Sequence, residues 1–246
     1  MLLAWDLVCA GAWFDESSMN NLLRLFRSSL GKKYMMAISG LLLFGFVVMH
    51  MLGNLQIFLG RNAINAYAKF LKSNMELLWP ARIGLLALAI IHITTAVQLV
   101  IENRAARPEP YGHVRPPVAT SFASRTIAIS GLIIFAFIVY HLLHFTFGVT
   151  NPSLMTLEDP TDPLRHDVYQ MMVNGFSNVW VSLFYIVSMG LLCLHLSHGV
   201  GSLFQSLGLR NVTYVRLIHR FSKAAAIVIF IGNASMPLAV LAGIVK

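Results

Sequence analysis

Histidines are the residues of this sequence that could do chemistry in its most apolar parts. Six of the nine histidines fall within long apolar segments whose interiors lack Asp, Glu and Lys. They are His50, His92, His141, His144, His195 and His198. An ionisable residue inside a membrane is costly and by default indicates function. A neutral imidazole can bind iron through one nitrogen without adding a buried charge, so facing histidines could hold a haem.

The composition indicates that a membrane surrounds these histidines. Of the 246 residues, 57% are apolar and only 11% are charged, whereas a soluble domain carries about 25% charged residues. The mean hydropathy is +0.70. Five segments have the length of about 20 mostly apolar residues that a spanning helix needs. They cover about 34–58, 80–101, 126–149, 179–204 and 224–245. We therefore expect an all-α, polytopic bundle of five transmembrane helices that forms one domain over residues 19–246. Residues 1–18 we expect to be an upstream extension without a role.

The basic residues predict how the chain is oriented. The net charge is +8, but the cations lie between apolar runs rather than in one patch. This favours contact with lipid over a nucleic-acid partner. Twelve of them precede the first span or lie in the loops that follow the second and fourth spans. The positive-inside rule then places the N-terminus in the cytoplasm. On the opposite side we expect a helix at the membrane interface over 59–79 and an irregular loop over 150–178.

An internal repeat relates the spans. Ser39-Gly40 aligns with Ser130-Gly131 at an offset of 91 residues, and the same offset aligns His50 with His141. The second and fourth spans match at an offset of 103 residues, which aligns His92 with His195. Because equivalent spans run in the same direction, the repeat indicates two parallel helix pairs around an axis normal to the membrane.

Depth along the spans sorts the histidines into two pairs. His50 and His141 fall in the outer half of their spans and form an expected outer pair. His92 and His195 fall in the inner half and form an expected inner pair. Each pair has the ligands of a bis-histidine haem iron, whereas zinc is a poor alternative without a carboxylate or a third ligand. A single histidine in a span is more often a hydrogen-bonding bridge, but four successive helices each supply at least one.

Several other residues could assist two haems. His144 and His198 compete for the ligand role, but they align with Gly53 and Thr95, so the repeat favours His141 and His195. Four glycines, Gly40, Gly45, Gly131 and Gly190, would let a flat macrocycle approach the helices. Candidate partners for the haem propionates are Lys33, Ser124 and Arg125 on the inner side and Arg82 on the outer side. Each of these could instead only anchor the protein at lipid headgroups.

A set of motifs spread over about residues 20–246 is specific in combination. They are SSLGKK (28–33), SGLLLFGFVVMHMLGN (39–54), NAYAKFLKS (65–73), ENRAARP (102–108), SRT (124–126), YHLLHFTFG (140–148) and LHLSHG (194–199). With these motifs the chain resembles the cytochrome b subunit of succinate dehydrogenase and fumarate reductase, in its single-chain, five-helix, di-haem form.

The resemblance implies a function and partners. It implies two haem b groups, with His50 and His141 on the distal haem and His92 and His195 on the proximal haem. It further implies an FAD-containing flavoprotein and an iron–sulfur subunit on the cytoplasmic face of a prokaryotic inner membrane. Electrons would pass to or from a quinone, expected to be menaquinone, with Glu76 as a candidate for proton exchange. Some members carry a glutamate two residues before the last haem histidine; here that residue is Cys193, which puts that proton path in doubt.

Three other functions stay open at this point. One is a cytochrome b of another respiratory quinone oxidoreductase, although such a helix would carry two haem histidines about four turns apart, and here the pairs within one span are three residues apart. Another is a proton-coupled transporter with histidine relays, which would need midplane carboxylates or broken helices; only Pro237 suggests one. The last is a structural anchor without haem. The sequence leaves open whether succinate is oxidised or fumarate is reduced.

Overall fold

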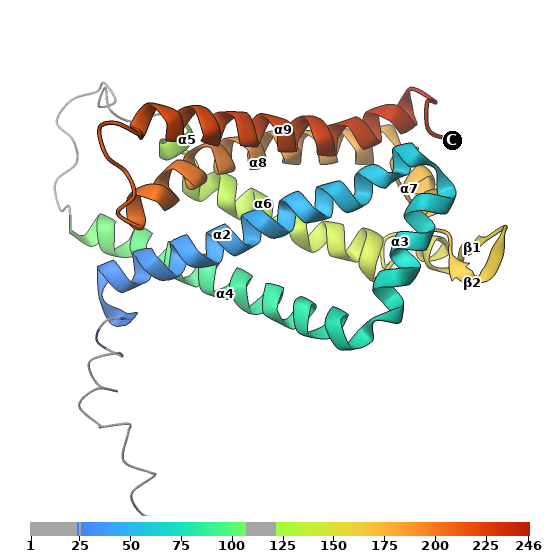
Figure 1. The fold of residues 1–246 in the computed structure, drawn as a ribbon, viewed down its shortest axis with the longest axis horizontal. Coiled ribbons are helices and arrows are strands. Elements are labelled where there is room, and N and C mark those ends of the chain that lie inside the picture. Colours follow the sequence, from blue (N-terminus) through green and yellow to red (C-terminus); the bar gives the residue numbers. More distant parts are fainter. Residues whose placement is uncertain (1–23, 25, 107–121) are drawn as a thin grey trace, which may run out of the picture.

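Five helices in the computed structural model are long and apolar enough to cross a membrane. The structure describes residues 24, 26–106 and 122–246, and the expected extension over residues 1–18 lies outside them. The spans are α2 (Ser29–Asn54) with η2 (Leu55–Leu59), α4 (Met75–Ala105), α6 (Ile127–His141) with the π-turn η3 (Leu142–Thr146), α8 (Val179–Ser206) and α9 (Val215–Leu241). The expected all-α multi-pass membrane bundle is therefore confirmed (Figure 1).

The boundaries of the spans follow local chemistry. Ser28 is the N-cap of α2, since its hydroxyl accepts from the Gly31 N–H at 3.0 Å. Asn178 is the N-cap of α8 and accepts from the Trp180 N–H at 2.9 Å. Such caps satisfy backbone donors that have no partner within the helix. The fifth span differs from the expected 224–245, because α9 begins at Val215 and ends at Leu241. The first two turns of α9 are basic, and a hydropathy pattern cannot show that a helix continues beyond its apolar residues. Pro237 lies inside this continuous helix.

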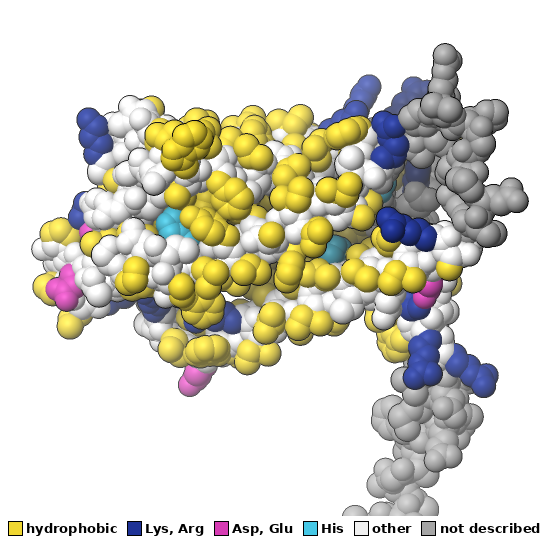
Figure 2. Space-filling model, turned by 180° about the vertical axis from the view of Figure 1, so that it is seen from behind, with side chains coloured by type: hydrophobic (Ala, Val, Ile, Leu, Met, Phe, Trp, Pro, Cys, Tyr) yellow, Lys and Arg dark blue, Asp and Glu magenta, His cyan; other side chains and the backbone are white. Residues whose placement is uncertain are grey.

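Helix α8 lies centrally in the bundle. It packs against α6, α9 and α2, and α2 also packs against α4 (Figure 1). The pairs α2–α4 and α6–α8 are the two helix pairs that the repeat predicts. Apolar side chains cover the middle of the molecule, and most of the visible Lys and Arg side chains gather at the end where α2 begins (Figure 2). This distribution suits a bundle whose middle is surrounded by lipid tails.

The opposite end of the bundle carries a folded cap, which we define as α3 (Arg61–Ser73), β1 (Glu158–Asp159), β2 (Asp162–His166) and α7 (Val168–Phe176). The helix expected over 59–79 is present in part, as α3, because residues 75–79 already belong to α4. The prediction of an irregular loop over 150–178 is wrong, because this segment forms the 3-10 turn η4 (Pro152–Thr156), an antiparallel two-stranded hairpin and α7. The short α5 (Phe122–Arg125) precedes α6.

A buried polar network explains why this segment folds. Asn65 of α3 is 0% exposed. Its side-chain amide donates to Asp159 Oδ2 at 2.6 Å and to Asp167 Oδ1 at 2.9 Å. Arg165 pairs with Asp159 at 2.7 Å and Arg61 pairs with Asp167 at 2.6 Å. Asp159 and Asp167 are therefore buried and pair with arginines, whereas in an irregular loop they would face water.

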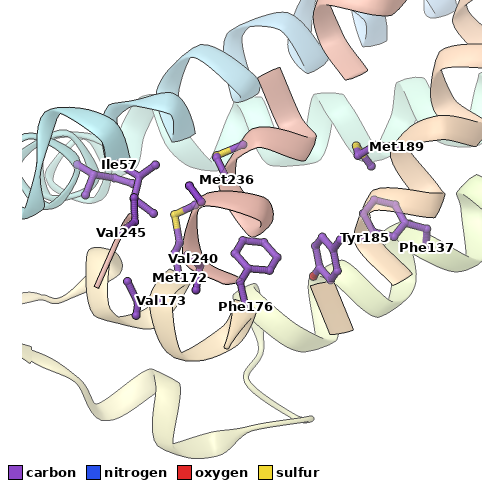
Figure 3. Packing of buried hydrophobic residues seen from close by; sticks show 12 residues of the cluster. Ile57, Phe137, Met172, Val173, Phe176, Tyr185, Met189, Met236, Val240 and Val245 are labelled. Atoms are coloured by element: carbon purple, nitrogen blue, oxygen red, sulfur yellow. The ribbon is translucent and has the colours of Figure 1, made fainter. Parts of the chain in front are cut away.

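An apolar cluster holds the cap to the end of the bundle. Met172, Val173 and Phe176 of α7 pack together with Ile57 of η2 and Met236 of α9 (Figure 3). The cluster continues into the bundle through Tyr185, Phe137 and Met189. The cap is thus continuous with the core that surrounds the outer histidines.

Candidate functional site

The structure brings the four candidate histidines together as two pairs. The ring centroids of His92 on α4 and His195 on α8 lie 6.5 Å apart. Those of His50 on α2 and His141 at the end of α6 lie 5.7 Å apart. Two imidazoles on opposite sides of one metal ion have centroids about 6 Å apart, because the metal–nitrogen bond is about 2 Å and the nitrogen lies about 1 Å from its ring centre. Both separations suit one iron between two rings.

The surroundings of His92 determine its tautomer. Its Nδ1 lies 3.2 Å from the carbonyl oxygen of Met36 and 3.2 Å from Ser39 Oγ. A carbonyl oxygen can only accept, so Nδ1 carries the proton. Ser39 Oγ donates to the Met35 carbonyl at 2.7 Å and can therefore also accept from His92. Nε2 is left with its lone pair, which is the form of histidine that binds a metal.

His195 repeats this arrangement on the other helix pair. Its Nδ1 lies 3.4 Å from Ser130 Oγ. Ser130 Oγ donates to the Ile127 carbonyl at 3.0 Å. Ile127 and Ser130 are the residues that the offset of 91 aligns with Met36 and Ser39. The repeat therefore places one matched serine acceptor on Nδ1 of each inner histidine.

Two of the four candidate glycines pack against the inner pair. A Cβ on Gly40 would lie 3.1 Å from His92 Cε1, and one on Gly131 would lie 3.5 Å from His195 Cε1. Gly45 has nothing within 4 Å of a built Cβ. Gly190 faces the Phe230 ring of α9 instead, at 3.9 Å. The Ser-Gly pairs thus contact the inner rings from α2 and α6.

The outer pair has different neighbours. His141 Nδ1 lies 3.4 Å from the Tyr185 hydroxyl, and His144 Nδ1 lies 3.1 Å from the same oxygen. His50 Nε2 accepts from the Asn54 amide at 3.3 Å, and its ring stacks on Phe46 with a centroid separation of 5.3 Å. Tyr185 and Asn54 were not singled out from the sequence. Asn54 is one helical turn after His50, which is a signal that spacing alone could have provided.

The remaining histidines and Cys193 have other partners. His144 is 3% exposed and lies inside the aromatic cluster around Tyr185. His198 Nε2 hydrogen-bonds Ser202 Oγ one turn later on α8, at 3.0 Å. Cys193 packs beside a small apolar cluster that contains Met51 and Ala226. These contacts suit packing or orientation more than metal binding.

The predicted propionate and quinone residues are less defined. Lys33 and Arg125 are exposed, and the side chain of Ser124 lies outside what the structure describes. Exposed Arg82 lies over the Trp79 ring, 5.4 Å from its centroid. Glu76, in the first turn of α4, is exposed and has no hydrogen-bond or ion-pair partner among the described residues. Within the described part of the chain, Lys33, Arg125, Arg82 and Glu76 form no hydrogen bond or ring contact with a candidate histidine.

A second cation lies near Arg82. Burial and the charge of Arg82 both lower the pKa of Lys72 at the end of α3. Burial and the charge of Lys72 in turn lower the pKa of His166 on β2. Lys72 is therefore close enough to Arg82 and to His166 for their charges to interact.

The donor set suits haem better than a small metal ion. Within the described ranges no three His, Cys, Asp or Glu side chains gather as ligands for an ion, but a haem iron needs only two axial ligands because the porphyrin supplies the rest. Comparisons with protein-family models, curated proteins and solved structures found no match for the chain.

Proposed function

We propose that this protein is the di-haem cytochrome b anchor subunit of a succinate:quinone oxidoreductase. The observation that supports it best is the matched pair of inner histidines. His92 and His195 come from two helix pairs related by the repeat, and serine hydroxyls at equivalent positions, Ser39 and Ser130, hold the Nδ1 proton of each ring. A bridging histidine needs no such matched control of both tautomers, whereas a pair of axial ligands does.

In this proposal each residue has a defined task. His92 and His195 hold the inner haem, and His50 and His141 hold the outer haem. Each haem, when bound, supplies one-electron transfer between its ferric and ferrous states. Ser39 and Ser130 orient the inner ligands, and their hydrogen bonds increase the basicity of the imidazoles. The candidate partners for the propionates are Lys33, Ser124, Arg125 and Arg82. The positive charge of Lys72 adds to that of Arg82. Glu76 is the candidate for quinone proton exchange.

The proposal includes partners, because the sequence contains no flavin, dicarboxylate or iron–sulfur motif. An FAD-containing flavoprotein and an iron–sulfur subunit would dock at the basic end of the bundle, on the cytoplasmic side of a prokaryotic inner membrane. Electrons would pass between the iron–sulfur subunit, the two haems and a quinone, proposed to be menaquinone. The exposed apolar side chains of the spans contact membrane lipid.

A haem count on the complex purified with its partners tests this function. We expect a dithionite-reduced minus oxidised spectrum of b type and two haems per chain in a pyridine haemochrome assay. Single replacements of His50, His92, His141 or His195 by Ala should each remove one haem. The matched control is His198→Ala, because His198 lies on the same helix as His195 and hydrogen-bonds Ser202 instead; it should keep both. A complex without haem would refute the proposal.

A further inference from the structure

The α-helical pattern of the third span changes directly after His141. Residues Leu142–Thr146 form a π-turn, which contains His144. Single π-turns within helices are rare and occur frequently at functional sites. Here the turn follows a candidate ligand, and both His141 and His144 reach the same hydroxyl on α8. That hydroxyl belongs to Tyr185, with Nδ1 distances of 3.4 Å to His141 and 3.1 Å to His144.

The chemistry of the three groups allows one useful order of hydrogen bonds. A tyrosine hydroxyl donates one proton, and it can accept another. If His141 is to bind a metal through Nε2, its Nδ1 carries the proton and donates to Tyr185. The Tyr185 hydroxyl must then donate elsewhere, and His144 Nδ1 is the acceptor within reach. In the reverse order Tyr185 would donate to His141 Nδ1, which would place a proton on Nε2 and prevent metal binding.

Packing leaves these groups little freedom. Tyr185 is 6% exposed and His144 is 3% exposed. The Tyr185 ring makes edge contacts with Phe137 at 5.0 Å and with Phe176 at 5.1 Å between centroids. His144 lies against the Phe145 ring at 4.1 Å. Gly175 of α7 backs the turn so closely that a Cβ there would lie 2.6 Å from Phe145 Cε1 and 3.3 Å from His144 Cε1. The cap therefore helps to hold the π-turn in place.

We propose that Tyr185 is a positioning residue that orients His141 for the outer metal site, and that His144 holds Tyr185 in the donor direction this requires. The inference rests on the proposed function, because it assigns roles around the outer haem. It also gives the histidines of the inner and outer sites chemically different hydrogen-bond acceptors. The inner histidines donate to serine hydroxyls, and His92 also to a backbone carbonyl, whereas His141 donates to a phenol that is itself donating.

The midpoint potential and the ferric electron paramagnetic resonance (EPR) signal of the outer haem test the inference. Tyr185→Phe removes the hydroxyl and keeps the ring. A ligand whose Nδ1–H loses its acceptor becomes less basic, so the ferrous form is favoured. We expect the ferrous-to-ferric ratio of the outer haem at a given potential to rise roughly tenfold, which is about 59 mV for one electron. The inner haem should keep its potential.

Matched variants separate orientation from packing. Tyr140→Phe is the control, because the Tyr140 ring lies 6.1 Å from Tyr185 and 5.6 Å from His144 between centroids, yet within the described structure its hydroxyl forms no hydrogen bond with His141 or His144. It should leave both haems unchanged. His144→Leu should shift the midpoint potential of the outer haem in the same direction as Tyr185→Phe. His144→Asn should restore much of the wild-type potential, because its amide oxygen can accept the Tyr185 proton at a similar place. The outer haem is identified as the one that His50→Ala removes.

Each outcome has a distinct meaning. Loss of the outer haem alone in Tyr185→Phe, with two haems in Tyr140→Phe, also supports the assignment. Two haems with wild-type potentials and EPR signals in Tyr185→Phe would overturn it while leaving the proposed function intact. No haem in the wild-type complex would overturn the proposed function itself.

Discussion

The repeat offers an internal comparison between two glycines that occupy equivalent positions. Gly40→Ala would place a Cβ 3.1 Å from His92 Cε1, whereas Gly131→Ala would place one 3.5 Å from His195 Cε1. The second distance is an ordinary van der Waals contact, and the first requires a movement of a few tenths of an ångström. The His92 ring is tethered at Nδ1 to Met36 and Ser39, so the movement strains these hydrogen bonds or displaces the helix.

The size of the difference follows from overpacking. Inserting a methyl group into a packed site costs about 1–3 kcal/mol, which applies to Gly40→Ala and not to Gly131→Ala. Both substitutions gain about 1 kcal/mol from replacing glycine inside a helix, so this gain cancels in the comparison. We expect Gly40→Ala to lower the occupancy of the proposed inner haem or to shift its ferric EPR signal, and Gly131→Ala to resemble the wild type.

The assay combines a pyridine haemochrome count with low-temperature EPR on the purified complex. Thermal unfolding of the same samples shows whether either variant loses the fold. An equal or larger effect of Gly131→Ala would refute the argument, since it would mean that the distances to the two rings do not control the inner site.

Three further predictions concern the cap. Asn65→Ala removes the hydrogen bonds to Asp159, Asp167 and the Tyr169 N–H; buried groups left unpaired should destabilise the cap by about 3–5 kcal/mol, measured as faster hydrogen exchange in α3 and α7. Burial raises the pKa of Asp159, but hydrogen bonds from Asn65, Thr161 and Arg165 outweigh it and hold that pKa well below its usual range. The ionised form of Asp159 thus stabilises the cap fully above about pH 5, and this contribution is lost as the pH falls. Protease cleavage of the cap in detergent should therefore accelerate with acidification. A cleavage rate independent of pH between 6 and 3 would contradict this. Gly175→Ala, whose Cβ would meet the Phe145 ring, should lower the midpoint of thermal unfolding and disturb the outer haem before the inner one, and an unchanged midpoint would show that the turn can yield.

Much of the architecture could be read from local properties of the chain. A spanning helix satisfies its own backbone hydrogen bonds in lipid, so a run of apolar residues predicts it without knowledge of its neighbours. The existence of five spans followed in this way, whereas the spaced apolar residues of α3 predicted a helix at the interface. Depth along a span needs only the direction of the chain and its rise per residue, so the pairing of His50 with His141 and of His92 with His195 was also accessible.

The sequence left the acidic segment after the third span unexplained. Its prolines and aspartates suggest a solvated loop, but the carboxylates bind Asn65 and Arg61 from another part of the chain, at sequence separations of up to 106 residues. A charged residue is buried when a partner from elsewhere compensates its desolvation, and composition does not reveal that partner.

The sequence by itself determined the class of protein, its spans, the matched Ser-Gly pairs and the histidines that share a depth. Only the tertiary structure decided which nitrogen of His92 and His195 carries the proton, and that Tyr185 lies between His141 and His144. The physical reason is the range of each effect. Hydropathy is a sum over neighbours in the chain, whereas a hydrogen bond acts over about 3 Å and depends on how far each helix is rotated and where it crosses the next.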